Sequence, residues 1–108
     1  MNKFMRLLVF FDLPVTTPEE RKCATSFRQW LVKNGYYMVQ YSVYARLCSG
    51  VDSADQHERS LMLNAPSTGS VRVLTVTEKQ YASIRIISGI KKPQEKHAKF
   101  VQMSFFTD

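Results

Sequence analysis

Asp12 is the residue of this sequence whose type and position best suit chemistry. It follows the apolar run of residues 7–11 and precedes Leu13 and Pro14. A carboxylate at the end of a buried strand can be positioned rigidly, and carboxylate oxygen is a ligand that Mg²⁺ prefers. An aspartate before Leu-Pro is equally typical of a plain turn, so both interpretations stay open. One aspartate per chain cannot form a magnesium site alone, whereas two from two copies could, with waters completing the coordination.

Other catalytic and metal-binding patterns are missing from the sequence. It contains no Gly-x-Ser-x-Gly motif and no glycine-rich phosphate loop. His57 and His97 lie forty residues apart with no cysteine or histidine at ligand spacing, which argues against zinc. The acidic residues near position 55 fall where a helix is expected to begin, so the helix dipole explains them. The sequence therefore does not favour a serine hydrolase, a zinc site or a P-loop protein.

The chain is basic, with a formal net charge of +6 and a pI near 9.6. This balance favours a polyanionic partner such as nucleic acid. The basic residues that we predict to contact a phosphate backbone form one set on the first expected helix and one near the C-terminus: Arg21, Arg28 and Lys33, then Lys91, Lys92, Lys96 and Lys99. The alternative for the second set is a solvated charged loop.

Residues 4–11 predict the first strand, and both of its faces are largely apolar. Both faces should therefore be covered, one by helices and the other by a second layer. Alternation places Arg6 and Asp12 on the same face, which we assign to contact with another subunit.

The first helix is predicted from its capping box. Thr17 is the expected N-cap, Pro18 the first helical residue and Glu20 the residue that reaches back. The helix should run to about Asn34, with Gly35 as its stop. Residues at helical spacing predict its buried stripe: Cys23, Ala24, Phe27, Trp30 and Leu31.

The rest of the chain predicts further strands and a second helix. Residues 36–48 predict one long strand or two short ones that meet near residues 40–42. Ser53 and Gln56 form a second capping box, and a helix should run from there to about Asn64. Residues 71–77 alternate as a strand. After this strand we expect a polar turn at 78–80, a fifth short strand at 83–89 and a last strand near 100–106.

This order predicts an α+β fold, a ferredoxin-like βαββαβ sandwich that forms one domain over residues 1–108. The two helices cover one face of the antiparallel sheet and leave the other face bare. A symmetric homodimer is the simplest way to cover it.

The sequence contains no apolar run long enough to span a membrane and no visible signal peptide, so we expect no membrane partner. Cys23 and Cys48 lack a Cys-x-x-Cys spacing and read as reduced thiols. Both features favour a cytoplasmic protein.

Several segments together resemble one protein family. They are the first strand ending in "FDLP" at 11–14, the helix start "EERK" at 19–22, Gly35, and "QYSVYARL" at 40–47. In this combination the chain resembles the CRISPR-associated Cas2 proteins of prokaryotes over nearly its whole length. The stretch "LTVTEKQY" at 74–81 looks like the end of the fourth strand in members from type II systems.

The resemblance implies a homodimer in which the C-terminal strand extension, residues 84–108, packs on the partner's sheet. It implies a Mg²⁺ at the dimer interface, with Asp12 as metal ligand and, in an active nuclease, as catalytic residue. Phe11 stands where many members have tyrosine, so a role for a phenol hydroxyl is absent. A family motif near the second and third strands maps onto Gln40, Ser42 and Tyr44, and basic helix residues map loosely onto Arg21 and Arg28.

Three functions follow from the resemblance. The favoured one is a bridge in spacer acquisition, in which the dimer binds the middle of a double-stranded DNA prespacer within a complex with the Cas-one integrase. The alternative is a Mg²⁺-dependent endonuclease that cleaves RNA or double-stranded DNA. A toxin ribonuclease of the VapD type is a third, weaker interpretation.

Overall fold

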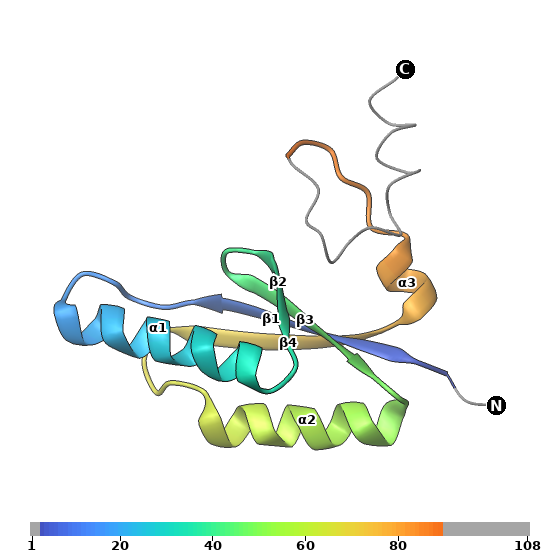
Figure 1. Cartoon of the computed structure of the whole chain (residues 1–108), viewed down its shortest axis with the longest axis horizontal. Coiled ribbons are helices and arrows are strands. Elements are labelled where there is room, and N and C mark those ends of the chain that lie inside the picture. The colour runs from blue at the N-terminus through green and yellow to red at the C-terminus, as the bar shows by residue number, and fades with distance from the viewer. Residues whose placement is uncertain (1–2, 90–108) are drawn as a thin grey trace.

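The computed structural model describes residues 3–89, and its strands form one antiparallel sheet. The strand order is β2-β3-β1-β4, which confirms the predicted α+β, ferredoxin-like arrangement. Helices α1 and α2 lie together on one face of the sheet (Figure 1). In chain order the elements are β1 (Met5–Asp12), α1 (Pro18–Lys33), β2 (Tyr37–Gln40), β3 (Val43–Cys48), α2 (Val51–Asn64), β4 (Ser70–Thr77) and α3 (Glu78–Ala82).

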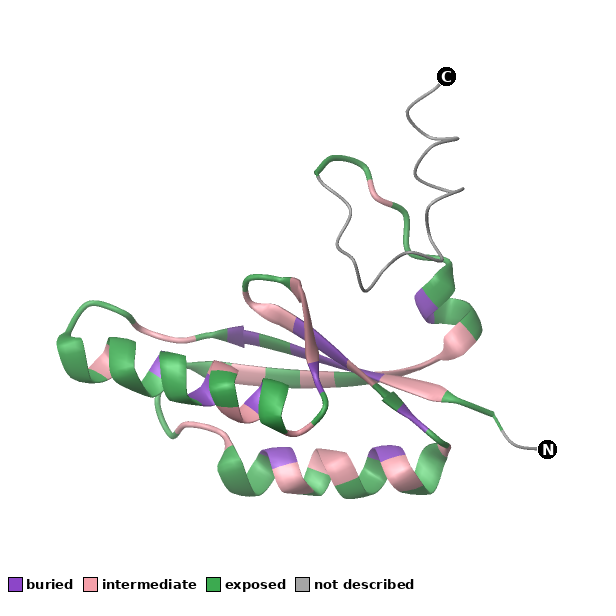
Figure 2. Ribbon diagram, viewed as in Figure 1, coloured by how far each residue is buried: buried purple, intermediate pink, exposed green. Residues whose placement is uncertain are grey.

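The central strand β1 contributes side chains to both faces of the sheet. Leu7, Val9 and Phe11 are buried against residues of α1 and α2 that include Phe27 and Leu61. Leu8 points to the opposite side and packs with Ala45 and Tyr81. Strand β1 pairs antiparallel with β3 and β4, so both of its backbone edges are bonded. The purple ribbon of Figure 2 runs along this central region.

Helix α1 begins as its capping box predicts. The Thr17 hydroxyl accepts the Glu20 N–H at 3.1 Å, and the Glu20 carboxylate accepts the Thr17 N–H at 2.9 Å. The helix is followed by Gly35, whose φ of +91° favours glycine. The predicted buried stripe is wrong at Cys23, which is exposed, because Ala24, Phe27 and Leu31 already complete the face turned to the sheet.

Residues 36–48 form two short strands, β2 and β3, which bend where the sequence predicted. The capping box predicted at Ser53 is wrong. Helix α2 begins at Val51 with Gly50 as its N-cap and no side-chain cap, so Ser53 already lies in its first turn. The reason is that β3 continues to Cys48 and leaves only Ser49 and Gly50 to make the turn into the helix.

The expected turn at 78–80 is instead the short helix α3. Its capping box uses Thr77, which accepts the Gln80 N–H at 3.0 Å. The fifth strand predicted at 83–89 is wrong, because these residues are not a strand and both Ile84 and Ile87 are exposed. The rest of the predicted C-terminal strand extension falls in residues 90–108, outside the described part. Among the described helices, none is long and apolar enough to cross a membrane.

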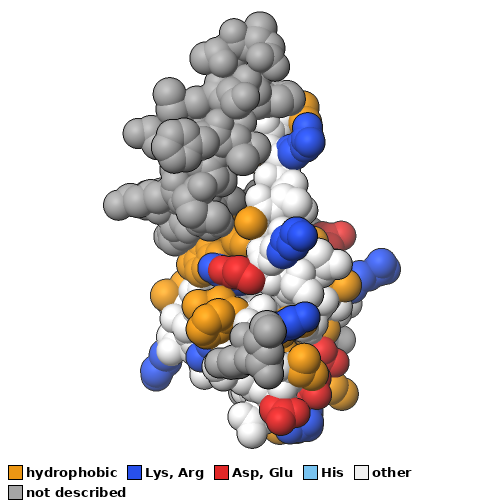
Figure 3. Space-filling model, turned by 90° about the vertical axis from the view of Figure 1, so that its right-hand side faces the viewer, with side chains coloured by type: hydrophobic (Ala, Val, Ile, Leu, Met, Phe, Trp, Pro, Cys, Tyr) orange, Lys and Arg blue, Asp and Glu red, His pale blue; other side chains and the backbone are white. Residues whose placement is uncertain are grey.

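The sheet face opposite α1 and α2, called the open face below, is only partly covered within the described part of the chain. Helix α3 packs at the end where β1 begins, through Tyr81. Figure 3 shows this end of the molecule, with hydrophobic side chains beside charged ones. On the same face, Phe10, Leu47 and Leu74 are exposed, with Leu74 at 52%. Within residues 3–89, the prediction of an incompletely covered apolar face is therefore confirmed.

Candidate functional site

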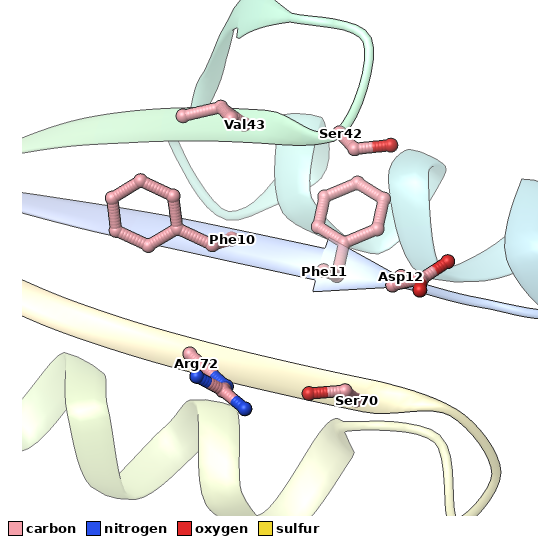
Figure 4. Close-up of a pocket in the computed structure, with 7 residues that line it drawn as sticks. All are labelled: Phe10, Phe11, Asp12, Ser42, Val43, Ser70 and Arg72. Atoms are coloured by element: carbon pink, nitrogen blue, oxygen red, sulfur yellow. The ribbon is translucent and has the colours of Figure 1, made fainter.

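A hollow of about 410 Å³ lies at the end of β1 (Figure 4). Asp12 is the last residue of β1, is exposed, and stands opposite Ser70 of β4 in the strand register. The Ser42 carbonyl accepts the Phe11 N–H at 3.0 Å and so brings the β2–β3 turn beside this strand end. The hollow thus collects one carboxylate and two serine hydroxyls from three separate segments.

Arg72 also lines the hollow. It stands opposite Phe10 in the β1–β4 register, so it shares the open face with Asp12. Arg72 is exposed and makes no hydrogen bond or ion pair with any residue between 3 and 89. Sequence reasoning missed both Arg72 and Ser70, although their even positions in an alternating strand place them on the open face.

Arg6 shares the open face with Asp12, as alternation predicted, but it lies at the other end of β1. Its guanidinium bonds to both carboxylate oxygens of Glu78, at 2.6 and 2.8 Å, and lies over the Tyr81 ring at 4.7 Å. This hydrogen bonding raises the pKa of Arg6, although partial burial opposes the shift. Arg6 therefore fastens α3 to the sheet and takes no part in the hollow.

The oxygen atoms in the hollow are suitable for Mg²⁺, which is usually bound through one or two carboxylates and several waters. Asp12 is the one carboxylate of the described residues that lines the hollow. Within the described residues there is no group of three histidine, cysteine or acidic side chains that could bind a metal. Asp12 of one chain is not enough for a magnesium site, so the Mg²⁺ shared by two copies stays a prediction.

The basic residues predicted on α1 are oriented by contacts within the chain. Arg21 donates to the carbonyls of Val15 and Thr16, at 3.2 and 3.0 Å. Arg28 lies 3.9 Å from the Tyr41 ring centroid, beside the hollow's Ser42. Lys33 ends α1 and is exposed. The four predicted lysines at 91, 92, 96 and 99 lie outside the described residues, so their role stays a prediction.

The three residues of the family motif are separated by the structure. Ser42 lines the hollow, and Gln40 is exposed at the end of β2. Tyr44 is buried on the helix side, where burial raises its pKa and its ring lies 5.7 Å from that of Phe11. Phe11 packs edge-on against Phe27, so both aromatic positions serve the core.

Three further titratable groups lie on the helix side of the sheet. Burial raises the pKa of Tyr36 to about 12, and its hydroxyl finds no partner among the described residues. Burial also raises the pKa of the Cys48 thiol. Burial lowers the pKa of His57, and the positive charge of Arg46 lowers it further. None of the three lines the hollow.

Comparison with known proteins identifies the same family over the described fold. The family model described as "CRISPR associated protein Cas2" matches residues 5–84. A CRISPR-associated endoribonuclease Cas2 of Acidovorax ebreus is 50% identical over 102 residues, which cover 94% of this chain and 100% of that protein. Proteins with the same name from Treponema denticola and Ligilactobacillus salivarius are 49% and 46% identical, covering 83% and 81% of this chain and 89% and 86% of their own lengths.

Proposed function

Because the chain belongs to the CRISPR-associated Cas2 family, we propose that it is a dimeric bridge in CRISPR spacer acquisition. In this role two copies bind the middle of a DNA duplex, while a partner integrase joins the DNA ends to the CRISPR array. A type II system is part of the proposal, and its support is the stretch at 74–81.

The open face is the observation that carries this proposal. Phe10, Leu47 and Leu74 are exposed on it, in neighbouring strands. Large apolar side chains exposed on one sheet face favour an interaction site, and a second copy with the same face would cover both chains at once. Dimerisation also brings the two Asp12 residues, and the basic side chains of both copies, into one particle.

The chemistry of the hollow favours a bridge over an enzyme. Hydrolysis of a phosphodiester by this fold needs a metal or a general base near the phosphate. Among residues 3–89, Asp12 is the only ionisable acid that lines the hollow, and no histidine of this range lines it. The bridging function requires no catalytic group, so the described residues of the hollow support it better than they support hydrolysis.

A second candidate function is a Mg²⁺-dependent endonuclease. It is favoured by the relatives, which are named CRISPR-associated endoribonucleases, and by the exposed Asp12 at the end of β1. Two Asp12 carboxylates from two copies would bind Mg²⁺, which when bound activates water and neutralises charge on the phosphate. The substrate would be RNA or double-stranded DNA. The toxin of the VapD type gains no support, because the match is to the Cas2 model.

The dimer is tested by Leu74→Glu, which places a charge in the middle of the open face. We expect this variant to be monomeric in light scattering at concentrations where the unmodified protein is dimeric. Met62→Glu is the matched control, because Met62 is 74% exposed on α2, on the helix layer. A Leu74→Glu protein that stays as dimeric as the control would show that the open face is not the subunit contact.

The two functions are separated by Asp12→Ala. Nuclease activity is measured with Mg²⁺, and spacer integration is measured with the partner integrase. The bridging function predicts that integration survives the substitution, whether or not cleavage is lost. Loss of integration together with cleavage would contradict a bridge that does not depend on the carboxylate, provided that the variant remains a folded dimer.

A further inference from the structure

We infer that the Arg6–Glu78 ion pair lies inside the contact between two copies of the chain and keeps that part of the contact electrically neutral. The inference rests on the proposed dimer and deepens it, because it assigns a charge pair to the contact beside its apolar side chains. This role differs from fixing α3 on the sheet, since it depends on the balance of charge between the two side chains. The partner is a second copy that brings the same neutral pair.

Large exposed side chains of the open face surround the ion pair. Leu47 of β3 stands opposite Arg6 in the strand register and is exposed. Phe4, two positions before Arg6, is also exposed, and its carbonyl accepts the Glu78 N–H at 3.3 Å. Leu74 is exposed farther along the same face, on β4. A second copy that covers these side chains therefore covers the ion pair among them.

Arg6 already has its hydrogen-bond partners inside its own chain. Its side chain is 13% exposed, and it donates to both Glu78 carboxylate oxygens and to the Tyr37 hydroxyl. Its guanidinium carbon also lies 4.7 Å from the centroid of the Tyr81 ring. Arg6 therefore requires no acceptor from a second copy, whereas the Glu78 side chain, at 43% exposed, still presents surface to one.

The balance of charge decides the cost of covering this pair. A cation that is covered without its anion loses its hydration, so removal of one partner of a covered ion pair is strongly destabilising. Replacement of both partners by uncharged side chains of similar size is often neutral or stabilising. Loss of Glu78 alone should therefore weaken the dimer more than loss of Arg6 and Glu78 together. A role limited to fixing α3 predicts the reverse order, because the double substitution removes every bond of the pair.

The test measures the monomer–dimer dissociation constant of the full chain by sedimentation equilibrium. Glu78→Gln should weaken the dimer about ten-fold or more, and Arg6→Met should also weaken it. The double variant Arg6→Met/Glu78→Gln should stay within about three-fold of the unmodified protein. Glu58→Gln is the matched control, because it removes the same charge from α2. Tyr37→Phe removes one hydrogen bond of the network without changing its charge, and should leave the dissociation constant unchanged.

The outcomes separate this inference from the proposed function. If the unmodified protein is a monomer, or if Leu74→Glu leaves the dimer intact, the proposed contact itself is wrong and the inference fails with it. If Leu74→Glu dissociates the dimer but Glu78→Gln matches Glu58→Gln, the ion pair lies outside a contact that still stands.

A role limited to fixing α3 would give a different pattern. The double variant would then dimerise as weakly as Glu78→Gln, or Tyr37→Phe would weaken the dimer as much as Glu78→Gln does. Either result overturns the inference and leaves the proposed dimer intact. Circular dichroism shows whether each variant is folded, and Arg6→Met takes the place of Glu78→Gln in the comparison if the latter does not fold.

Discussion

Arg6 of β1 and Glu78 of α3 form a bidentate ion pair. Arg6 Nε and Nη2 donate to the two Glu78 carboxylate oxygens at 2.6 and 2.8 Å. The Arg6 guanidinium also donates to the Tyr37 hydroxyl, which in turn donates to the Tyr81 hydroxyl at 2.6 Å. Because Tyr81 is buried against Leu8 and Ala45, this network fixes α3 on the open face.

We predict that Glu78→Gln destabilises the protein and loosens α3. The Glu78 side chain is 43% exposed, which screens the pair, so we expect a loss of about 1 kcal/mol in urea unfolding at neutral pH. Amide hydrogens of α3 should exchange faster than those of α1. Glu58→Gln, on α2, is the control. Equal unfolding midpoints for the two variants would show that the ion pair contributes nothing to stability.

Arg28 is predicted to stabilise the turn beside the hollow through its planar guanidinium as well as its charge. It lies 3.9 Å from the Tyr41 ring centroid and 5.2 Å from that of Phe11. Arg28→Lys preserves the charge and removes the planar contact, so we expect a loss of about 0.5–1 kcal/mol. Arg59→Lys provides the comparison in the same urea titration. If both variants unfold alike, the ring contacts of Arg28 carry no free energy.

Local signals allowed much of the fold to be predicted from the sequence. The Thr17 capping box and the alternation of β1 depend on residues close together in the chain, and both are confirmed. The same kind of signal is present at Thr77 and Gln80, where the prediction was a polar turn and the structure has the five-residue helix α3. Ser53 and Gln56 show the same sequence pattern but form no capping box. Strand β3 ends at Cys48 and α2 begins at Val51, so Ser53 already lies inside the helix.

The candidate site could be predicted only in part. Asp12 was identifiable because no cap or core role explains it. The neighbours that complete the hollow, Ser70 and Arg72, come from β4, about sixty positions away in the chain. Their position depends on the register between β1 and β4. A shift of β4 by one residue would move both side chains to the opposite face of the sheet. Long-range register is not encoded in any short motif, so these residues became visible only in the folded chain.

Two adjacent tyrosines should respond in opposite ways to loss of their hydroxyls. Tyr36 is buried, and its hydroxyl has no partner in the described part of the chain, so Tyr36→Phe should leave stability unchanged or raise it by up to about 1 kcal/mol. Tyr37→Phe removes the bridge between Arg6 and Tyr81 and should cost about 1 kcal/mol. Urea unfolding of both variants tests this, and a clear loss for Tyr36→Phe would mean that its hydroxyl is bonded.

The pH dependence of stability should include a contribution from His57. Burial and the charge of Arg46 lower its pKa in the folded protein below the usual value near 6.5. The unfolded chain therefore binds a proton first as the pH falls, and the free energy of unfolding decreases from about pH 7 downward until the folded form is protonated as well. His57→Gln should lose less stability than the unmodified protein between pH 7.5 and pH 5. Urea titrations at the two pH values give the change in the free energy of unfolding for each protein. Groups that both proteins share contribute equally to the two changes, so the difference between them reports on His57. A variant whose stability falls as steeply as that of the unmodified protein would show that His57 is not the group that titrates.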